Sequence, residues 1–164
     1  QMFASGCRLV ISMTSSGQIL PVRKPPYFVL IEKSLRDEGC SYHYLPPSEY
    51  CEISEELLSI LEGAFSDIPD TVEHGATWTT DAPFRETKTA IAHSREIGIL
   101  AVEMEAAALY AFSKAKKKPV VCFAHVTNQM GNVDGDFEKG AEMGGIGALR
   151  IIEATARAWL NGHF

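Results

Sequence analysis

The sequence predicts an α/β fold in which the strands of a largely parallel or mixed sheet alternate along the chain with helices. Short apolar runs that suit buried strands recur between residues 8 and 126. Segments whose apolar residues recur at helical spacing lie between and after these runs. A chain of 164 residues can bury a substantial core, so we expect a single domain over residues 1–164.

Four nearly continuous apolar runs are predicted to be strands, because such runs suit a sheet covered on both faces. A fifth segment, at residues 72–78, is predicted to be a strand because its residues alternate. These strands are expected at residues 8–13, 27–32, 72–78, 99–102 and 119–126. A hydroxyl-rich turn is expected at residues 14–17, where the sequence reads Thr-Ser-Ser-Gly. Residues 42–48 are expected to form a loop because they contain a Pro-Pro pair.

Four segments are predicted to be helical. Ser54 suits the N-cap of a helix to about residue 65, and the alanine-rich segment 104–116 favours a second helix. The lysine run at 116–118 is interpreted as a favourable charge at that helix end. Further helices are expected at 88–95 and 143–160, and the polar stretch 131–140 is expected to be mobile.

Composition argues against several classes of protein. The net charge of -6 argues against nucleic-acid binding, which needs a basic face. No apolar run approaches the roughly 18 residues of a membrane span, and the N-terminus lacks the form of a signal peptide, so no membrane partner is expected. The four cysteines show no metal-ligand spacing, so we expect no metal site and a reduced, cytoplasmic setting.

Polar side chains gather where predicted strands end, which is where α/β sheets place their ligands. The hydroxyls of residues 14–17 can hold a phosphate or a sugar, although such turns are also common without a ligand. Glu103 and Glu105 flank Met104 at a strand-to-helix junction. They can bind vicinal ribose hydroxyls, or they can serve only as favourable charges at the start of a helix.

Two further strand ends carry candidate groups. The amide of Asn128 can both donate to and accept from the edge of a purine, whereas His125 in the preceding strand is interpreted as a core residue. Phe84 and Arg85 follow the predicted strand at 72–78. They suit stacking on a heterocycle, although a phenylalanine after a proline is also commonly a core side chain.

Taken in order, these motifs resemble the nucleoside phosphorylase superfamily, which includes purine nucleoside, uridine and methylthioadenosine phosphorylases. The resemblance extends over residues 6–159, and its most specific part is GILAVEMEAA at residues 98–107. It implies a three-layer, nucleoside phosphorylase-like fold with a mixed central sheet flanked by helices. It also implies a homo-oligomer, as a dimer, trimer or hexamer.

The resemblance assigns roles to the residues of the first two clusters. Ser15 is similar to the family's phosphate-contacting hydroxyl, with Ser16 and Gly17 lining the sugar and base. Glu105 is similar to the carboxylate that holds the ribose hydroxyls, with Met104 against the sugar.

Four more residues receive roles from the resemblance. Glu103 lies beside the ribose carboxylate, and Phe84 is placed to stack on the base with Arg85 next to it. Asn128 stands where many hexameric purine enzymes carry an aspartate. The segment 126–128 resembles the base-binding segment of trimeric 6-oxopurine enzymes. Uridine phosphorylases usually carry a Gln-x-Arg pair that this chain lacks, so purine is favoured over uridine.

The function implied by the resemblance is phosphorolytic cleavage of nucleosides to a free base and ribose 1-phosphate, with Glu105 and Asn128 as the catalytic residues. Inorganic phosphate is the expected co-substrate, and no other cofactor is expected. Two alternatives remain open. One is a hydrolytic nucleosidase. The other is an inactive, truncated nucleoside-binding fragment, because the chain begins after the N-terminal segment that supplies most phosphate-binding cations in the family.

Overall fold

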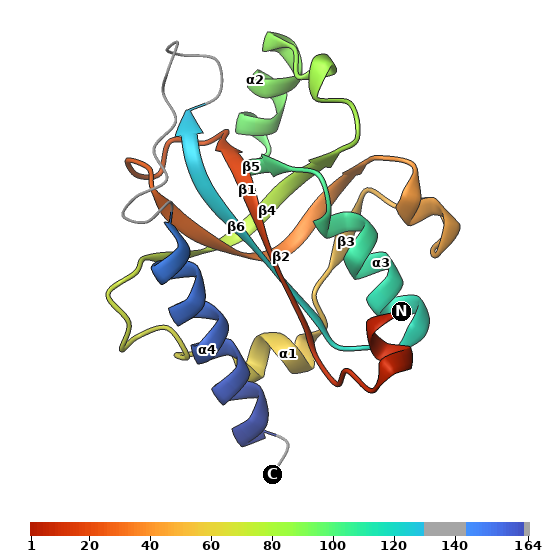
Figure 1. Cartoon of the computed structure of the whole chain (residues 1–164). Coiled ribbons are helices and arrows are strands. Elements are labelled where there is room, and N and C mark those ends of the chain that lie inside the picture. Colours follow the sequence, from red (N-terminus) through yellow and green to blue (C-terminus); the bar gives the residue numbers. More distant parts are fainter. Residues whose placement is uncertain (130–143, 163–164) are drawn as a thin grey trace.

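One sheet that closes on itself organises the molecule (Figure 1). The computed structural model describes residues 1–129 and 144–162. Among these residues six strands pair in the order β3-β2-β4-β5-β1-β6, and β2 pairs additionally with β6. The strands are β1 (Val10–Gln18), β2 (Tyr27–Asp37), β3 (Tyr50–Glu52), β4 (Val72–Thr80), β5 (Ile99–Glu103) and β6 (Val120–Gln129).

The sheet is mixed, which confirms the predicted α/β class with a mixed sheet. Strands β1 and β6 are parallel, as are β2 and β4, and β4 and β5. The pairings of β1 with β5, of β2 with β3 and of β2 with β6 are antiparallel. The expected three-layer arrangement is not confirmed, because the β2–β6 pairing curls the sheet into a closed ladder.

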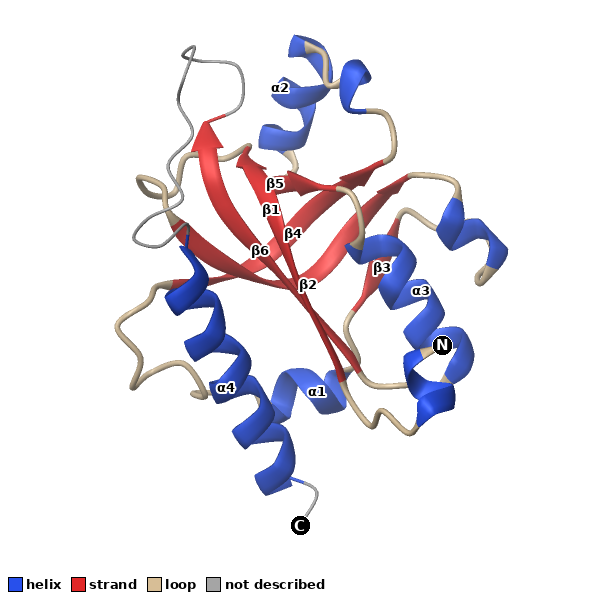
Figure 2. Ribbon diagram, viewed as in Figure 1, coloured by secondary structure: helices blue, strands red, loops and turns tan. Residues whose placement is uncertain are grey.

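Helices pack around this sheet in the described part of the chain (Figure 2). Helix α3 packs against β2 and β3, α2 packs against β5, and α1 contacts α4. The α-helices are α1 (Glu55–Ile60), α2 (Lys88–Glu96), α3 (Ala106–Lys116) and α4 (Gly145–Gly162). Three short 3₁₀ helices are η1 (Met2–Ser5), η2 (Cys40–His43) and η3 (Pro83–Arg85).

The expected turn at residues 14–17 is wrong, because these residues continue β1 and pair with β6. Serine, threonine and glycine favour turns locally, but pairing with a neighbouring strand overrides that preference. Strand β2 likewise runs past the predicted end at residue 32 to Asp37. There the side chain of Ser34 is buried and hydrogen-bonded, so a polar residue is accommodated in a buried strand.

Other boundaries differ less. The helix predicted over 54–65 ends at Ile60, and Ser54 is its N-cap, as predicted, accepting a hydrogen bond from the Leu57 N–H at 3.3 Å. Strand β3 was not predicted, and η2 includes the first two residues of the predicted loop 42–48. The polar stretch 131–140 and the predicted helix start at residue 143 lie outside the described residues.

Tyr110 of α3 extends the β2–β6 pairing where those two strands separate. The last paired residues are Leu30 and Phe123. One step further, the buried Tyr110 hydroxyl donates to the Ile31 carbonyl at 2.5 Å and accepts from the Cys122 N–H at 3.1 Å. The hydroxyl therefore satisfies the two backbone groups that would otherwise pair with each other.

Replacing this hydroxyl by hydrogen is expected to destabilise the protein. Tyr110→Phe leaves a buried carbonyl and a buried N–H without partners, so we expect a loss of about 1–3 kcal/mol in the free energy of unfolding. Chemical denaturation followed by circular dichroism measures it. Tyr44→Phe is the matched control, since Tyr44 is exposed. Equal denaturation midpoints for the two variants would contradict the bridging role.

Candidate active site

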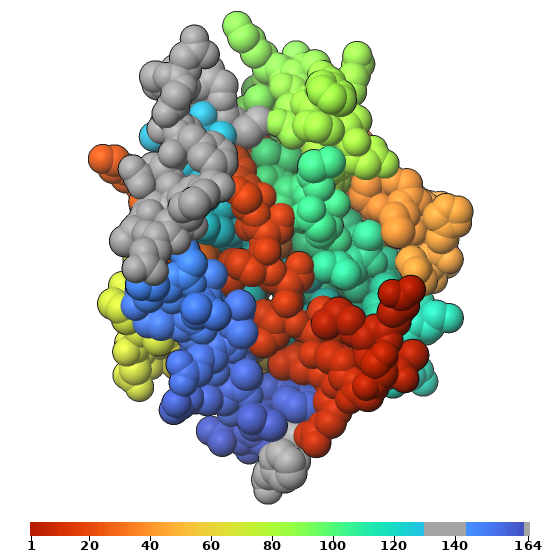
Figure 3. Space-filling model, in the orientation of Figure 1, coloured from red at the N-terminus to blue at the C-terminus, as the bar shows by residue number. Residues whose placement is uncertain are grey.

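Three of the sequence motifs lie on neighbouring strands. Strand β1 lies between β5 and β6, and Gly17 pairs with Val102 on one side and with Asn128 on the other. The serine segment, the Met-Glu motif and Asn128 therefore lie close together. On the face shown in Figure 3, β1 reaches the surface between α3 and α4.

Glu105 is the N-cap residue of α3, and its carboxylate is directed towards β1. Its Oε2 atom accepts a hydrogen bond from the Thr14 hydroxyl at 2.6 Å and another from the Met104 N–H at 3.2 Å. Both Glu105 and Met104 are exposed. The carboxylate is thus held at a defined place and remains open to a ligand, which suits the recognition of vicinal hydroxyls.

Glu103 has a different environment, because it is only 2% exposed. Its Oε2 atom accepts the N–H groups of Glu105 and Ala106, each at 2.7 Å. Burial raises the pKa of Glu103, and hydrogen bonds from Thr79 and from those N–H groups hold the rise back. The structure thus places Glu103 beneath the first turn of α3, where it fixes the backbone of Glu105.

Buried hydroxyls complete the environment of Glu103. The Oε1 atom accepts hydrogen bonds from Ser34 and Thr77 at 3.1 Å each and from Thr79 at 2.5 Å. Thr79 also accepts the N–H of Ala107 at 3.0 Å, so it joins the carboxylate to the start of α3. Ser34 and Thr77 were not predicted to be functional, since hydroxyl residues along a strand also occur on ordinary sheets.

The serine segment and Asn128 meet through Thr127. The hydroxyls of Ser15 and Thr127 lie 3.3 Å apart, and Thr127 donates to the Asn128 Oδ1 atom at 3.4 Å. Ser15 is exposed, whereas the hydroxyl of Ser16 is buried and has no hydrogen-bond partner among residues 1–129 and 144–162. An unpaired buried hydroxyl costs about 1–3 kcal/mol, which makes Ser16 notable in this site.

Phe84 and Arg85 lie in η3, which follows β4. Phe84 is 96% exposed, and Arg85 is exposed as well. Within the part of the chain that the structure describes, neither side chain makes a hydrogen bond, ion pair or ring contact that would join it to the cluster around Glu105. The structure therefore brings together Ser15, Gly17, Glu105 and Asn128, and it leaves Phe84 and Arg85 on a neighbouring exposed segment.

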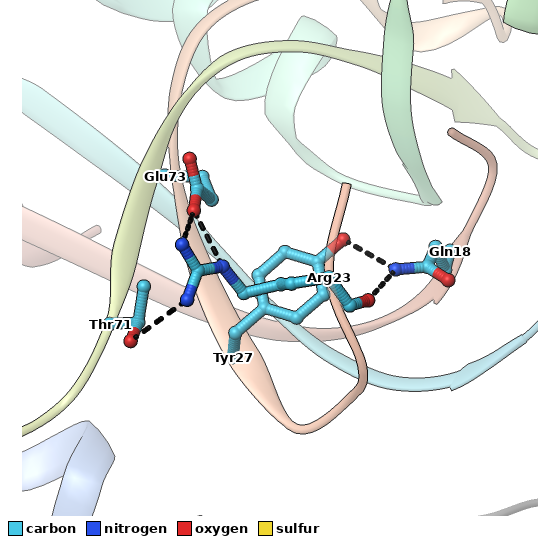
Figure 4. A network of polar contacts seen from close by, with 5 residues as sticks. All are labelled: Gln18, Arg23, Tyr27, Thr71 and Glu73. Atoms are coloured by element: carbon cyan, nitrogen blue, oxygen red, sulfur yellow. Dashed lines mark hydrogen bonds and ion pairs between the residues drawn. The ribbon is translucent and has the colours of Figure 1, made fainter. Parts of the chain in front are cut away.

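The loop between β1 and β2 is fixed by the network drawn in Figure 4. The Gln18 amide nitrogen donates to the Arg23 carbonyl at 2.6 Å and to the Tyr27 hydroxyl at 3.0 Å. The Arg23 guanidinium forms an ion pair with Glu73 and donates to the Thr71 hydroxyl at 3.4 Å. Arg23 therefore neutralises a carboxylate at the start of β4 rather than serving as an anion site.

Two cavities lie at different distances from the cluster formed by Ser15, Gly17, Glu105 and Asn128. One of about 470 Å³ lies at the C-terminal end of α3, roughly 16 Å along the helix from Glu105. A smaller one of about 260 Å³ adjoins the ends of β1 and β6. Its lining residues are Gln18, Ile19, Pro21, Arg95 and Gln129. Since Gln18 and Gln129 directly follow Gly17 and Asn128, this cavity adjoins the cluster formed by Ser15, Gly17, Glu105 and Asn128.

Over 1–129 and 144–162, no cluster of three or more His, Cys, Asp or Glu side chains could hold a metal ion. No helix in these ranges is long and apolar enough to cross a membrane.

Comparison with known proteins places this arrangement in a family. The family model described as the phosphorylase superfamily matches residues 1–156 of the chain. The match contains the six strands of the described residues, together with Ser15, Gly17, Glu105 and Asn128. No curated protein matches the chain.

Proposed function

The chain belongs to the phosphorylase superfamily, and we propose that it cleaves the N-glycosidic bond of nucleosides by phosphorolysis. The products are a free base and ribose 1-phosphate. The observation that carries the proposal is the exposed Glu105 carboxylate, held by Thr14 at the first turn of α3. A carboxylate accepts two hydrogen bonds at once, so it can bind the 2′ and 3′ hydroxyls of one ribose.

Positioning and electrostatics account for the proposed rate enhancement. Glu105 fixes the ribose, and the exposed Met104 packs against the sugar. Inorganic phosphate is the co-substrate, and the hydroxyl of Ser15 donates a hydrogen bond to it. Ser16 and Gly17 line the sugar and base. The unpaired Ser16 hydroxyl supports this role, because a ligand oxygen would supply its missing partner.

Asn128 acts on the leaving base in this proposal. As the glycosidic bond stretches, the sugar acquires oxocarbenium character and negative charge develops on the base. The Thr127 hydroxyl donates to the Asn128 Oδ1 atom, which leaves the amide N–H groups to stabilise that charge. The absence of the Gln-x-Arg pair of uridine phosphorylases favours a purine over uracil in this proposal, and Phe84 and Arg85 of the exposed η3 segment are assigned to the base.

A reducing, cytoplasmic setting and a homo-oligomeric state belong to the same proposal. All four cysteines are free, which fits a compartment that keeps thiols reduced. Apolar side chains of Ile146, Leu149 and Leu160 are exposed along α4, where a second copy would cover them.

The proposal is tested by incubating the protein with inosine, adenosine or uridine, each with and without phosphate, and measuring free base by chromatography. We expect phosphate-dependent release, with a purine nucleoside cleaved faster than uridine. Release that does not depend on phosphate would identify a nucleosidase instead. Absence of release from all three nucleosides would contradict both enzymatic functions.

A further inference from the structure

The cavity at the ends of β1 and β6 carries polar groups that have no role in the mechanism above. Its polar lining consists of Gln18, Arg95 and Gln129. In the register of the sheet, Gln18 is the partner of Gln129, one step beyond the pairing of Gly17 with Asn128. The cavity therefore continues the proposed base site beyond Asn128.

Strand geometry places the cavity at a distance from the Glu105 carboxylate that a nucleoside can span. Thr14, which binds Glu105, and Gln18 are four residues apart in β1. Side chains four apart in a strand point to the same face, about 13 Å from each other. A nucleoside whose ribose binds Glu105 can therefore extend its base along β1 towards Gln18.

The orientation of the Gln18 amide is determined by its partners. The carbonyl of Arg23 can only accept a hydrogen bond, so the amide atom facing it at 2.6 Å is the nitrogen. That nitrogen also donates to the Tyr27 hydroxyl. Figure 4 shows both bonds leaving from this one atom. The oxygen Oε1 is thus the part of the amide left to accept a hydrogen bond in the cavity.

Arg95 supplies donors to the same cavity. Its Nε–H donates to the Ile19 carbonyl at 2.7 Å, which ties the end of α2 to the end of β1. Its two terminal nitrogens make no hydrogen bond or ion pair with any residue in the described ranges. A guanidinium anchored through Nε presents these nitrogens as a rigid fork of donors.

We propose that Gln18 and Arg95 form a specificity pocket for a base with a lactam edge, that is, a ring N–H next to a carbonyl. This inference rests on the proposed function. The ring N–H donates to Gln18 Oε1, and the carbonyl accepts from Arg95. 6-Oxopurines and uracil carry such an edge.

Adenine fits this pair poorly. Its exocyclic amino group would direct donors at the Arg95 guanidinium, and its ring nitrogen would direct a lone pair at Gln18 Oε1. A site built to satisfy hydrogen bonds rejects an analogue that leaves its polar groups unpaired much more strongly than an apolar pocket does. The parent protein should therefore cleave inosine in preference to adenosine by about 100-fold or more in kcat/KM.

The variant that tests the pocket is Arg95→Met, which keeps the length of the side chain and removes its donors. We expect kcat/KM for inosine to fall about 30-fold and that for adenosine to change less than about threefold. Arg95→Lys keeps the positive charge but lacks the planar pair of donors, so its kcat/KM for inosine should lie between those of the parent and of Arg95→Met. Lys88→Met, on the first turn of the same helix and outside the cavity, is the control.

The outcomes separate this inference from the proposed function. An inosine-to-adenosine ratio unchanged in Arg95→Met, or a parent protein that prefers adenosine, would overturn the pocket while phosphorolysis stands. If the parent cleaves no nucleoside, calorimetric titration with hypoxanthine, uracil and adenine tests the pocket directly. Weaker binding of hypoxanthine or uracil by Arg95→Met then supports the pocket, and no binding of any base by the parent overturns it.

Discussion

Glu105→Gln is expected to lower kcat/KM for nucleoside cleavage about 100-fold. The neutral amide retains the size of the side chain and its contact with Thr14. In the amide, an NH₂ group, which can only donate, replaces one of the two carboxylate oxygens that would accept hydrogen bonds from the ribose hydroxyls. Hydrogen bonds to a charged group contribute about 1.5–3 kcal/mol each, and 1.4 kcal/mol corresponds to a factor of ten.

Steady-state kinetics with and without saturating phosphate measure this effect. Glu62→Gln is the matched control, because Glu62 is also an exposed glutamate and lies outside the cluster. Circular dichroism should show the same unfolding transition for both variants, since Glu105 is exposed. Activity retained in Glu105→Gln would contradict the role of this carboxylate in ribose binding.

Replacing Glu103 is expected to have the largest effect on stability. In Glu103→Ala the N–H groups of Glu105 and Ala106 and the hydroxyl of Thr79 lose a buried acceptor. Unsatisfied buried donors cost about 1–3 kcal/mol each, so we expect a total loss of about 3 kcal/mol, as some hydroxyls find new partners. Glu103→Gln should lose only about 1 kcal/mol, because its oxygen can face the N–H groups and its amino group the hydroxyls.

The pH dependence of stability distinguishes this carboxyl from an ordinary surface group. Burial raises the pKa of folded Glu103 above the usual 4.5, so the folded state binds more protons than the unfolded state above that pH. Its contribution to stability therefore decreases as the pH rises from about 4.5 through the folded pKa. Burial raises the pKa of Glu86 as well, so denaturation across this range should show a steeper decrease in the parent than in Glu103→Gln. The same slope in both proteins would contradict it.

Periodicity and composition predicted most elements of the fold. Residues 27–32, 72–78, 99–102 and 119–126 all lie in strands, apart from Pro119, and residues 88–95 lie in α2. What local pattern could not reveal was the continuation of β1 through residues 14–17, because that depends on pairing with a strand more than a hundred residues away. Closure of the sheet by β2 and β6 also depends on pairing between residues far apart in the sequence, and no local sequence feature predicts it.

The site was partly predictable for a related reason. Glu105, Ser15 and Asn128 were identified because they follow or interrupt apolar runs, and the structure places them on adjacent elements. The distinct environments of Glu103 and Glu105 were not predicted. One carboxylate is buried among hydroxyls and the other is exposed, and that difference arises from the side chains of β2 and β4 rather than from the motif itself.

The two attachments of α3 have a consequence for how the site moves. The helix is bound to the sheet at its first turn through Glu103 and one turn further through the Tyr110 hydroxyl. Both attachments consist of buried hydrogen bonds to strands in the centre of the sheet. Local opening that releases Glu105 must therefore break the buried bonds from the N–H groups of Glu105 and Ala106 to Glu103. We expect these two amides to be protected from hydrogen exchange, although the Glu105 side chain is exposed.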